Sequence, residues 1–479
     1  MNAITNLQPA PMYIDPIYGV HTYQSKKPYN IVRSYILNYS KPGEIIADPF
    51  AGSGVVGLES LRCAIKDSIR KAVLLDINPL AIFISKIIIM PYTLNELKEF
   101  ENTVKNIVSK IHEKTKYLWE IRCSQCGNNA IVLSVTYNSL NDENDPRLRQ
   151  WRATKIKYWC RRCRRVYYKR ATENDNSKIL ETWYTIDKSN FPVSQWKFLT
   201  NTRINIYEDM TVVDIYTPRN LYTLHLMLNE INKCNNKKIR ELMRFTFSAI
   251  LRSVSMCRSE SGGKAVQHFH IDKKGMVERN PLDAFISKAL GITIAGTKVP
   301  FNMPSVKRSK ELLLKEWLAI GHKIGLDIDL YEGNIEESMI FASDFSELEQ
   351  PGPPFVLIKQ HSATRLLEIV GSKSIDYVHT DPPYVDQVPY LEVYLPNIAW
   401  LELMSLNEYS KILKDEIILS DSTERPDKLR KSIDGINNYR RLMYEALSEI
   451  KKALKINRWL SLWYCTANEI YWRIVNDLS

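Results

Sequence analysis

The chain has 479 residues, of which 44% are hydrophobic and 25% charged, so we expect a globular protein of more than one structural unit with a sizeable core. Its formal net charge of +11 favours a polyanionic partner, above all a nucleic acid. Residues 1–15 lack the pattern of a secretory signal, and the most apolar segment, residues 82–90, is far shorter than the roughly 20 residues that span a bilayer. We therefore expect a cytoplasmic protein.

The first part of the chain alternates between helix and strand patterns. Helical spacing occurs at residues 29–39, 55–64 and 79–89, and short apolar runs occur at residues 44–49 and 72–77. Alternation of this kind predicts a doubly wound, mostly parallel α/β sheet. We assign residues 1–92 to the first half of this domain.

A glycine-rich turn follows the first apolar run and reads Asp48-Pro49-Phe50-Ala51-Gly52-Ser53-Gly54. Glycines let the backbone approach a ligand at the carboxyl edge of the sheet, where doubly wound folds bind nucleotides. The next strand ends in Asp76, 28 positions after Asp48, as in one βαβ unit whose acid accepts ribose hydroxyls. The turn lacks the Lys-Ser/Thr ending of a P-loop, so a nucleoside-type ligand is favoured over a triphosphate. The candidate cofactor-binding residues are Asp48, Phe50, Ala51, Gly52, Gly54 and Asp76.

The alternation stops after residue 92. Thr93 and Glu96 form a capping box, and a long charged helix is expected to run to about Trp119. Further helical patterns cover residues 220–232, 239–256 and 307–322. We interpret residues 93–352 as a large, mainly helical insert that interrupts the sheet.

Two cysteine pairs lie in this insert, Cys123-x2-Cys126 and Cys160-x2-Cys163, with 33 residues between the pairs. Four thiolates in two CxxC pairs are typical of a tetrahedral structural zinc site, and clustered cysteines in a reducing compartment favour metal over disulfides. We therefore predict a zinc ribbon over about residues 121–170.

A basic stripe overlaps the second cysteine pair. Residues 147–170 contain eleven Lys or Arg and no acid, with Trp and Tyr interleaved. Cations beside aromatic rings are typical of nucleic-acid binding, although a solvated charged face has the same composition. The candidate nucleic-acid-binding residues are Arg147, Arg149, Arg152, Arg161, Arg162, Arg164 and Arg165.

The strand–helix alternation returns near residue 353. Strands are expected at residues 355–359, 374–380 and 459–465, with helices at 391–404 and 438–454 and from residue 467. We assign residues 353–479 to the second half of the sheet domain.

The strand at residues 374–380 runs into Asp381-Pro382-Pro383-Tyr384. The prolines stiffen the chain and leave the Pro382 carbonyl exposed, because Pro383 cannot continue a ladder. A carboxylate and a fixed carbonyl together can accept both hydrogens of a planar amino group, and Tyr384 offers a face on which a base can stack. The candidate catalytic residues are Asp381, Pro382, Pro383 and Tyr384.

The glycine-rich loop, Asp76 and the Asp-Pro-Pro-Tyr loop together resemble the motifs of the DNA amino-methyltransferases, and more narrowly the adenine-specific DNA methylases that carry a zinc ribbon. The motif order is similar to the alpha arrangement. The segment from Tyr18 to Lys26 is similar to the N-terminal cofactor-side segment of that family, and the resemblance covers most of the chain. It implies a Rossmann-like methyltransferase that uses S-adenosylmethionine, binds double-stranded DNA and methylates an exocyclic amino group, with adenine N6 favoured. It also implies that the Asp-Pro-Pro-Tyr loop contacts the target base.

The sheet of this family usually closes with an antiparallel strand pair, for which no sequence remains after the last expected helix. We therefore expect a missing closing hairpin and allow for a second polypeptide that supplies it, or for a companion nuclease of a restriction–modification system. Three alternatives stay open at this stage. They are methylation of cytosine N4, N-methylation of RNA or protein, and a non-catalytic DNA-binding subunit.

Overall fold

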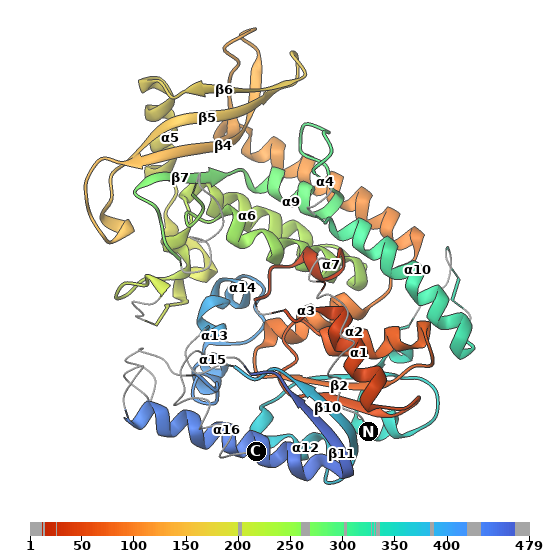
Figure 1. Ribbon diagram of the computed structural model, residues 1–479. Coiled ribbons are helices and arrows are strands. Elements are labelled where there is room, and N and C mark those ends of the chain that lie inside the picture. The colour runs from red at the N-terminus through yellow and green to blue at the C-terminus, as the bar shows by residue number, and fades with distance from the viewer. Residues whose placement is uncertain are drawn as a thin grey trace. The chain divides into compact units, whose positions relative to one another are not determined.

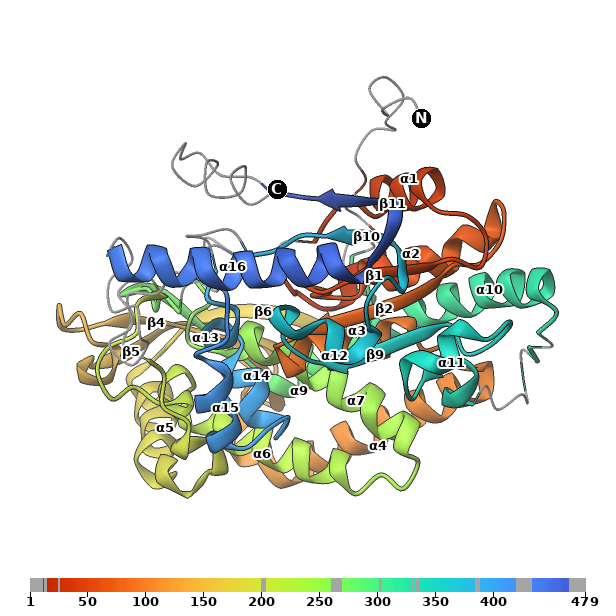
Figure 2. The same cartoon turned by 90° about the horizontal axis from the view of Figure 1, so that it is seen from below.

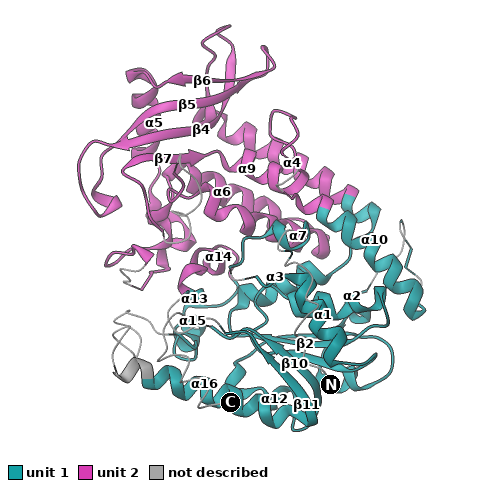
Figure 3. Cartoon of the chain, in the orientation of Figure 1, with its two compact units in different colours: residues 1–97, 309–391, 403–479 teal, residues 98–308, 392–402 magenta. Residues whose placement is uncertain are grey.

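The computed structural model describes residues 12, 15–24, 26–199, 204–259, 269–300, 304–326, 328–329, 331, 336–383, 388–418 and 433–464. The chain forms two compact units. Unit 1 comprises residues 1–97, 309–391 and 403–479, and unit 2 comprises residues 98–308 and 392–402 (Figure 3). No helix among the described residues is long and apolar enough to cross a membrane.

Unit 1 is built on a six-stranded sheet in which every pairing is parallel. In spatial order the strands are β11 (Leu454–Leu462), β10 (Ile375–Thr380), β1 (Ile45–Asp48), β2 (Lys71–Asp76), β9 (Val356–Gln360) and β8 (Phe341–Ala342). The central strands β1 and β10 are buried along their whole length, as the apolar runs predict for a parallel sheet covered on both faces. The α/β class and the parallel sheet expected from the alternation are thus confirmed.

Helices cover both faces of this sheet (Figures 1 and 2). One side carries α1 (Tyr29–Tyr39), α2 (Val55–Arg62) and α3 (Pro79–Ile89), and the other carries α12 (Leu367–Val370) and α16 (Ile433–Ala453). α3 starts where expected because Asn78 caps it with a hydrogen bond of 3.0 Å from the Leu80 amide. The apolar side of α16, from Tyr439 to Ala453, packs into one core with β1, β2, β9 and β10.

The chain returns to unit 1 at residue 309, before residue 353, where the second half of the sheet domain was expected to begin. The helix α10 (Val306–Ile324) enters unit 1 at residue 309, and its Trp317 indole donates to the Ile89 carbonyl at the end of α3, 3.1 Å away. The strand β8 then pairs with β9. Both segments lie within the range that the sequence pattern assigned to the insert, because a two-residue strand gives no periodic signal.

Unit 2 combines helices with a second sheet, so the expectation of a mainly helical insert was incomplete. The predicted capping box of Thr93 and Glu96 is present, and α4 (Leu94–Trp119) ends where expected. The further helices are α5 (Glu173–Thr185), α6 (Pro218–Asn232), α7 (Lys237–Ile250), α9 (Pro281–Leu290) and α14 (Leu395–Trp400). The antiparallel strands are β3 (Glu120–Arg122), β4 (Asn129–Ser139), β5 (Trp151–Cys160), β6 (Arg165–Arg170) and β7 (Lys274–Arg279), which pairs with β4.

Two details near the end of the chain differ from the expected elements, and a third is not described. The helix expected at residues 391–404 is split into α13 (Tyr390–Val393) and α14, because Pro396 can occupy only the first turn of a helix. The strand β11 starts directly after α16, earlier than the expected residue 459. Cys465 and the expected last helix lie outside the described residues.

Candidate functional site

A cavity of unit 1 lies at the carboxyl ends of β1, β2, β9 and β10. It is lined by the whole glycine-rich loop except Gly54, by Asp76, and by Asp381, Pro382 and Pro383. The sequence-predicted cofactor and catalytic loops, which lie about 300 residues apart in the chain, therefore meet in one cavity. This is the edge at which doubly wound sheets bind their ligands.

The glycine-rich loop is held in place by Asp76. The Gly52 amide donates to Asp76 Oδ2 at 2.8 Å, and the Asn78 amide donates to Oδ1 at 2.9 Å. Gly52 has φ +52° and Gly54 has φ +75°, a region that favours glycine. A Cβ on Gly54 would also meet Ser85 Cβ at 2.8 Å, so this glycine lets the loop pack against α3. Gly54 thus supports the loop from beneath and does not line the cavity.

Two carboxyl groups, the buried Asp48 and the half-buried Asp76, face this cavity from neighbouring strand ends. Burial raises the pKa of Asp48 to about 7, while hydrogen bonds from Thr380 and the Phe50 amide oppose the rise and the nearby Asp381 and Asp76 add to it. Burial likewise raises the pKa of Asp76 to about 6, opposed by its two backbone donors. Each Asp76 oxygen accepts one amide and keeps a second lone pair, so the fixed carboxylate can accept two hydroxyl groups of a ligand.

Asp381 lies beside a cation at the carboxyl end of β10. Lys27 Nζ is 2.8 Å from Asp381 Oδ2, and the same ammonium lies 5.5 Å from the centre of the Trp463 ring. Asp381 and Lys27 are each about one fifth exposed, so a molecule that enters the cavity can reach the pair.

The two carbonyl groups after Asp381 differ in their partners. The Pro383 carbonyl accepts a hydrogen bond of 2.9 Å from the buried Tyr439 hydroxyl of α16. Within the described part of the chain, no donor contacts the Pro382 carbonyl. Tyr384, the fourth candidate catalytic residue, lies outside the described residues.

His379 supports the catalytic loop from within the sheet. Its Nε2 accepts from the Trp463 indole at 2.9 Å, and its Nδ1 lies 2.9 Å from the Tyr377 hydroxyl, which donates to Ser461. Burial lowers the pKa of His379 to about 3, so the ring is neutral and carries its proton on Nδ1. We interpret His379 as a structural link between β10 and β11 that fixes Trp463.

The arrangement suits the binding of a nucleoside-type cofactor beside a planar amino group. Carboxylate acceptors at the ends of β1 and β2 can hold hydroxyl and ammonium groups of a cofactor, and Asp381 and Pro382 line the same cavity at the next strand end. Several lining residues had no signal in the sequence. They are Lys27, Ser362, Ala363, Asp415, Glu416 and Ile417, whereas Tyr23 belongs to the segment from Tyr18 to Lys26 that the resemblance placed on the cofactor side.

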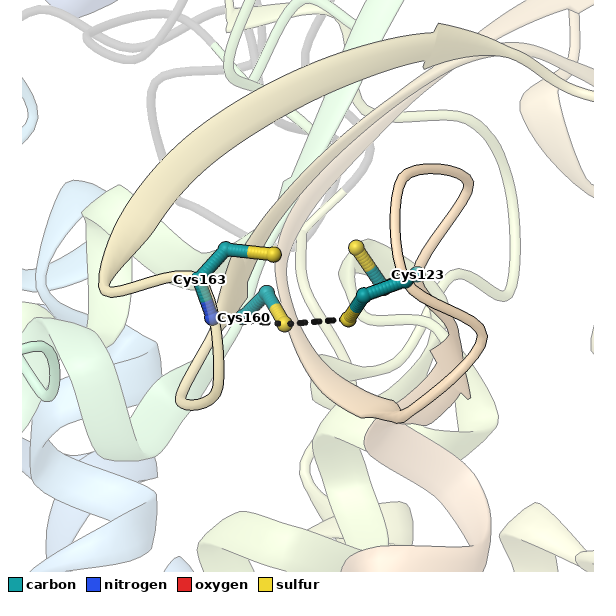
Figure 4. A group of neighbouring side chains, drawn as sticks. Cys123, Cys160 and Cys163 are labelled. Atoms are coloured by element: carbon teal, nitrogen blue, oxygen red, sulfur yellow. Dashed lines mark hydrogen bonds between the residues drawn. The ribbon is translucent and has the colours of Figure 1, made fainter.

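The four predicted metal ligands lie together in unit 2. Their Sγ atoms are all within 4.8 Å of one another. Cys123 and Cys126 lie in the turn between β3 and β4, Cys160 ends β5, and Cys163 lies in the turn that follows it; Figure 4 shows Cys123, Cys160 and Cys163. In a ZnS4 tetrahedron with Zn–S bonds of about 2.3 Å, the sulfurs lie about 3.8 Å apart. Backbone amides point at the sulfurs, as the Gln125 amide does at 3.4 Å from Cys123 Sγ. The donor set therefore fits a closed structural zinc site.

The seven candidate nucleic-acid-binding arginines fall into two groups. Arg147 pairs with Asp145 and the Glu208 carbonyl, Arg149 donates to three backbone carbonyls, and Arg152 pairs with Glu173. The other four are exposed and make no ion pair or hydrogen bond with any described side chain. They are Arg161, Arg162, Arg164 and Arg165.

Comparison with known proteins gives two matches. Residues 6–86 match the model of a family of N6/N4 DNA methylases. The Type II methyltransferase M.MjaII of Methanocaldococcus jannaschii is 21% identical over 402 residues, which make up 82% of this chain and 63% of that protein. This chain thus spans less than two thirds of the length of that relative. No solved structure matches the chain. The resemblance to the DNA amino-methyltransferases predicted from the motifs is confirmed.

Proposed function

We propose that this chain, as a DNA amino-methyltransferase, transfers a methyl group from S-adenosylmethionine to an exocyclic amino group of a DNA base, with adenine N6 the favoured target. One observation carries the proposal: the cofactor-type loop with Asp76 and the catalytic-type loop with Asp381 line the same cavity. The match to DNA methylases supports the substrate class.

The cofactor would lie across the ends of β1 and β2. Asp76, fixed by the Gly52 and Asn78 amides, would accept the ribose hydroxyls. Asp48 would face the charged methionine end, where an ammonium group would favour its ionised form. Phe50 and Ala51 line the same cavity and would contact the nucleoside. When bound, the cofactor supplies an electrophilic methyl group on a sulfonium.

The target amino group would bind between the Asp381 carboxylate and the Pro382 carbonyl. Accepting both N–H hydrogens would align the nitrogen lone pair with the methyl group, so that the C–N bond could form as the C–S bond breaks, without a covalent intermediate on the enzyme. A neutral thioether would leave, and the methylated nitrogen would pass one N–H proton to the Asp381 carboxylate. Tyr439 already binds the Pro383 carbonyl, which leaves the Pro382 carbonyl as the acceptor. The base must leave the duplex to reach this site, at a cost of a few kcal/mol, and Tyr384 would stack on it.

Methylation of cytosine N4 is the main alternative, because the same acceptor pair holds either amine and the matched family covers both targets. Nucleoside analysis of DNA after incubation with labelled cofactor distinguishes the two products. DNA of varied sequence should be used, because the recognition sequence is not known.

The decisive variant is Asp381→Ala. It should abolish transfer to DNA while cofactor affinity changes little, since Asp76 and the glycine-rich loop are intact. Glu445 lies on the exposed side of α16 and is not one of the residues that line the cavity. Glu445→Ala therefore removes a carboxylate outside the site and serves as the control. Transfer by Asp381→Ala at the wild-type rate would show that another group holds the target. No transfer by the wild-type protein to DNA, but transfer to RNA or protein, would refute the substrate class.

A further inference from the structure

The sheet of unit 2 has one face that forms the core of this unit. Val135, Tyr137, Ile156, Tyr158 and Glu278 alternate along β4, β5 and β7 and are completely buried. The helix α5 covers this face, since its Asn176 bonds the backbone of Ala153 and its Trp183 packs against Tyr137. Alternate residues of the same strands must point to the opposite face.

The strand register aligns the residues of that opposite face in rows across the sheet. In the first row Tyr168 pairs with Lys157, Lys157 with Ser134, and Ser134 with Arg279. Directly opposed residues of antiparallel strands project to the same face. Lys157 of β5 and Arg279 of β7, 122 positions apart in the chain, therefore stand on one face with a small side chain between them.

Two more rows follow the same rule. Arg170 pairs with Lys155, Lys155 with Thr136, and Thr136 with Val277. The Val277 amide donates to the Arg258 carbonyl at 2.7 Å and Ser259 bridges Met276, so Arg258 extends this row.

In the third row Arg152 pairs with Asn138, and Asn138 with Lys274. We call the resulting surface the basic sheet face. Its cations are Arg152, Lys155, Lys157, Arg170, Arg258, Lys274 and Arg279.

Few acids neutralise the basic sheet face. Arg152 pairs with Glu173, and Arg279 lies 3.3 Å from Asp283. Lys157, Arg170, Arg258 and Lys274 make no ion pair within the described ranges. Burial, helped by the charge of Arg279, lowers the pKa of Arg258 and lowers that of Lys288, on the adjoining α9, to about 8. These cations repel one another, so a bound anion would stabilise them.

Aromatic side chains lie among these cations. Tyr168 is 59% exposed, and the ammonium groups of Lys155 and Lys157 lie 5.4 and 5.6 Å from its ring centre. Trp159 projects to the same face, two residues after Lys157 on β5. Amphipathic rings of this kind can rest against sugars and bases while the cations contact phosphates.

The size of the face also fits a polyanion. Strands lie about 4.8 Å apart, so a row that crosses from β6 to the segment of Arg258 spans roughly 20 Å. Duplex DNA carries one negative charge per about 1.7 Å of its axis, so a segment of this length has about a dozen phosphates on its two strands, and a surface on one side would contact only part of them. The four cations that make no ion pair within the described ranges, Lys157, Arg170, Arg258 and Lys274, are a suitable number for such a surface.

We propose that the basic sheet face binds the phosphate backbone of duplex DNA. The inference rests on the proposed function and identifies the surface that holds the substrate. The basic sheet face differs from the basic stripe of residues 147–170 in two ways. Arg147 and Arg149 of the stripe donate hydrogen bonds to backbone carbonyl groups of the protein and are not part of the face. The face also includes Arg258, Lys274 and Arg279, which come from distant segments of the chain.

Two charge-reversal pairs test this surface from different parts of the chain. The first is Lys157→Glu with Arg170→Glu, and the second is Arg258→Glu with Lys274→Glu. The control pair is Lys98→Glu with Lys116→Glu, two exposed lysines of α4 in the same unit. Fluorescence anisotropy of a labelled mixed-sequence duplex, measured in the full chain between 50 and 200 mM KCl, gives affinity and salt dependence.

Each charge-reversal pair on the basic sheet face should reduce the magnitude of the negative slope of log K against log salt by about 2, and should weaken binding roughly 10- to 100-fold at low salt. The control pair should leave the slope and the affinity unchanged. If a reversed pair does not fold, the corresponding Gln variants, which neutralise the charges, should give the same direction of change.

Three outcomes would overturn the proposal. If both charge-reversal variants bind DNA with the same steep salt dependence as the wild-type protein, DNA binds to another surface. In that case, methyl transfer by the wild-type protein would still support the proposed function. Equal weakening in the control pair would show a general charge effect. Tighter binding of a duplex RNA than of duplex DNA would assign the face to another polymer, and absence of both DNA binding and DNA methylation would refute the proposed function itself.

Discussion

The ammonium group of Lys27 lies 2.8 Å from the Asp381 carboxylate, at the strand end next to the one that carries Asp48. The charge of Asp381 contributes to the raised pKa of Asp48, so the two carboxyl groups repel each other. Lys27 is itself placed against the ring of Trp463, which His379 fixes by a hydrogen bond. The cation is thus positioned to favour the ionised form of Asp381, which can accept one amino hydrogen of the target while the Pro382 carbonyl accepts the other.

Replacing Lys27 by Gln should move the acidic limb of the kcat profile to higher pH. Without Lys27, Asp381 loses this ion pair while the repulsion between Asp381 and Asp48 remains, so the carboxylate would take up a proton at higher pH. The neighbouring His379 is neutral above about pH 3 and cannot replace the charge. Methyl-transfer rates from pH 5.5 to 9 measure this limb. Lys27→Arg should restore the wild-type profile, and an unchanged profile in Lys27→Gln would exclude the role.

Asp48→Asn should stabilise the free protein at pH 8 and weaken cofactor binding. The folded-state pKa of about 7 exceeds the usual 3.8, so between these values the folded state holds a proton that the unfolded chain has lost, and stability falls as pH rises through this window. At about 1.36 kcal/mol per pKa unit, removing the charge should gain roughly 1–3 kcal/mol. Urea unfolding at pH 8 and pH 5 measures the gain, which should be small at pH 5. A loss of stability at pH 8 would show that Asp48 has an unseen compensating partner.

Asp76→Ala should weaken S-adenosylmethionine binding at least 10-fold, because Asp76 both faces the cavity and holds the Gly52 amide. In the wild-type protein, binding should also weaken as pH falls below about 6, where this carboxylate becomes protonated. Calorimetric titration with the cofactor measures both effects, with Glu445→Ala as the surface control. Unchanged affinity in Asp76→Ala would remove Asp76 from the cofactor site.

The sequence predicted the sheet domain well because its signals are local. Asp48, Gly52 and Asp76 sit within one βαβ unit, and Asp381 follows a buried strand directly, so strand ends and their side chains could be assigned from the pattern. Lys27 and Asp415 could not be found in this way. They reach the cavity from irregular segments, and only the fold brings them to it.

The insert was harder to predict from its sequence. The cysteine spacing located the metal ligands, but β4 and β5 contain bulges that break the alternation of buried and exposed residues. Arg258 and Arg279 join the basic sheet face through strand pairing between distant segments, which no local pattern records.

Protein purified without chelator should contain one zinc per chain, held by Cys123, Cys126, Cys160 and Cys163. Cys160→Ala should lose the metal and lower the melting temperature of unit 2, because a closed thiolate site contributes folding energy directly. Elemental analysis and thermal unfolding with and without EDTA measure both. Cys234→Ala, a half-buried cysteine outside the cluster, should retain the zinc. A zinc-free wild-type protein would contradict the assignment.

Tyr439→Phe should lower kcat roughly 10- to 100-fold and leave cofactor affinity within about twofold. The Tyr439 hydroxyl is buried and donates to the Pro383 carbonyl at 2.9 Å, and burial holds its pKa well above the usual value, so it remains a donor at working pH. Phe keeps the packing of α16 but leaves the Pro383 carbonyl without its donor, at a cost of about 1 kcal/mol or more in stability. The loop would then relax, and the Pro382 carbonyl would lose its alignment with Asp381.

Tyr444→Phe, which changes an exposed tyrosine of the same helix, is the matched control and should behave as the wild-type protein. Single-turnover methylation rates, measured beside calorimetric cofactor affinity, separate this positioning effect from loss of cofactor. A wild-type rate in Tyr439→Phe would mean that the prolines alone hold the acceptor pair in place.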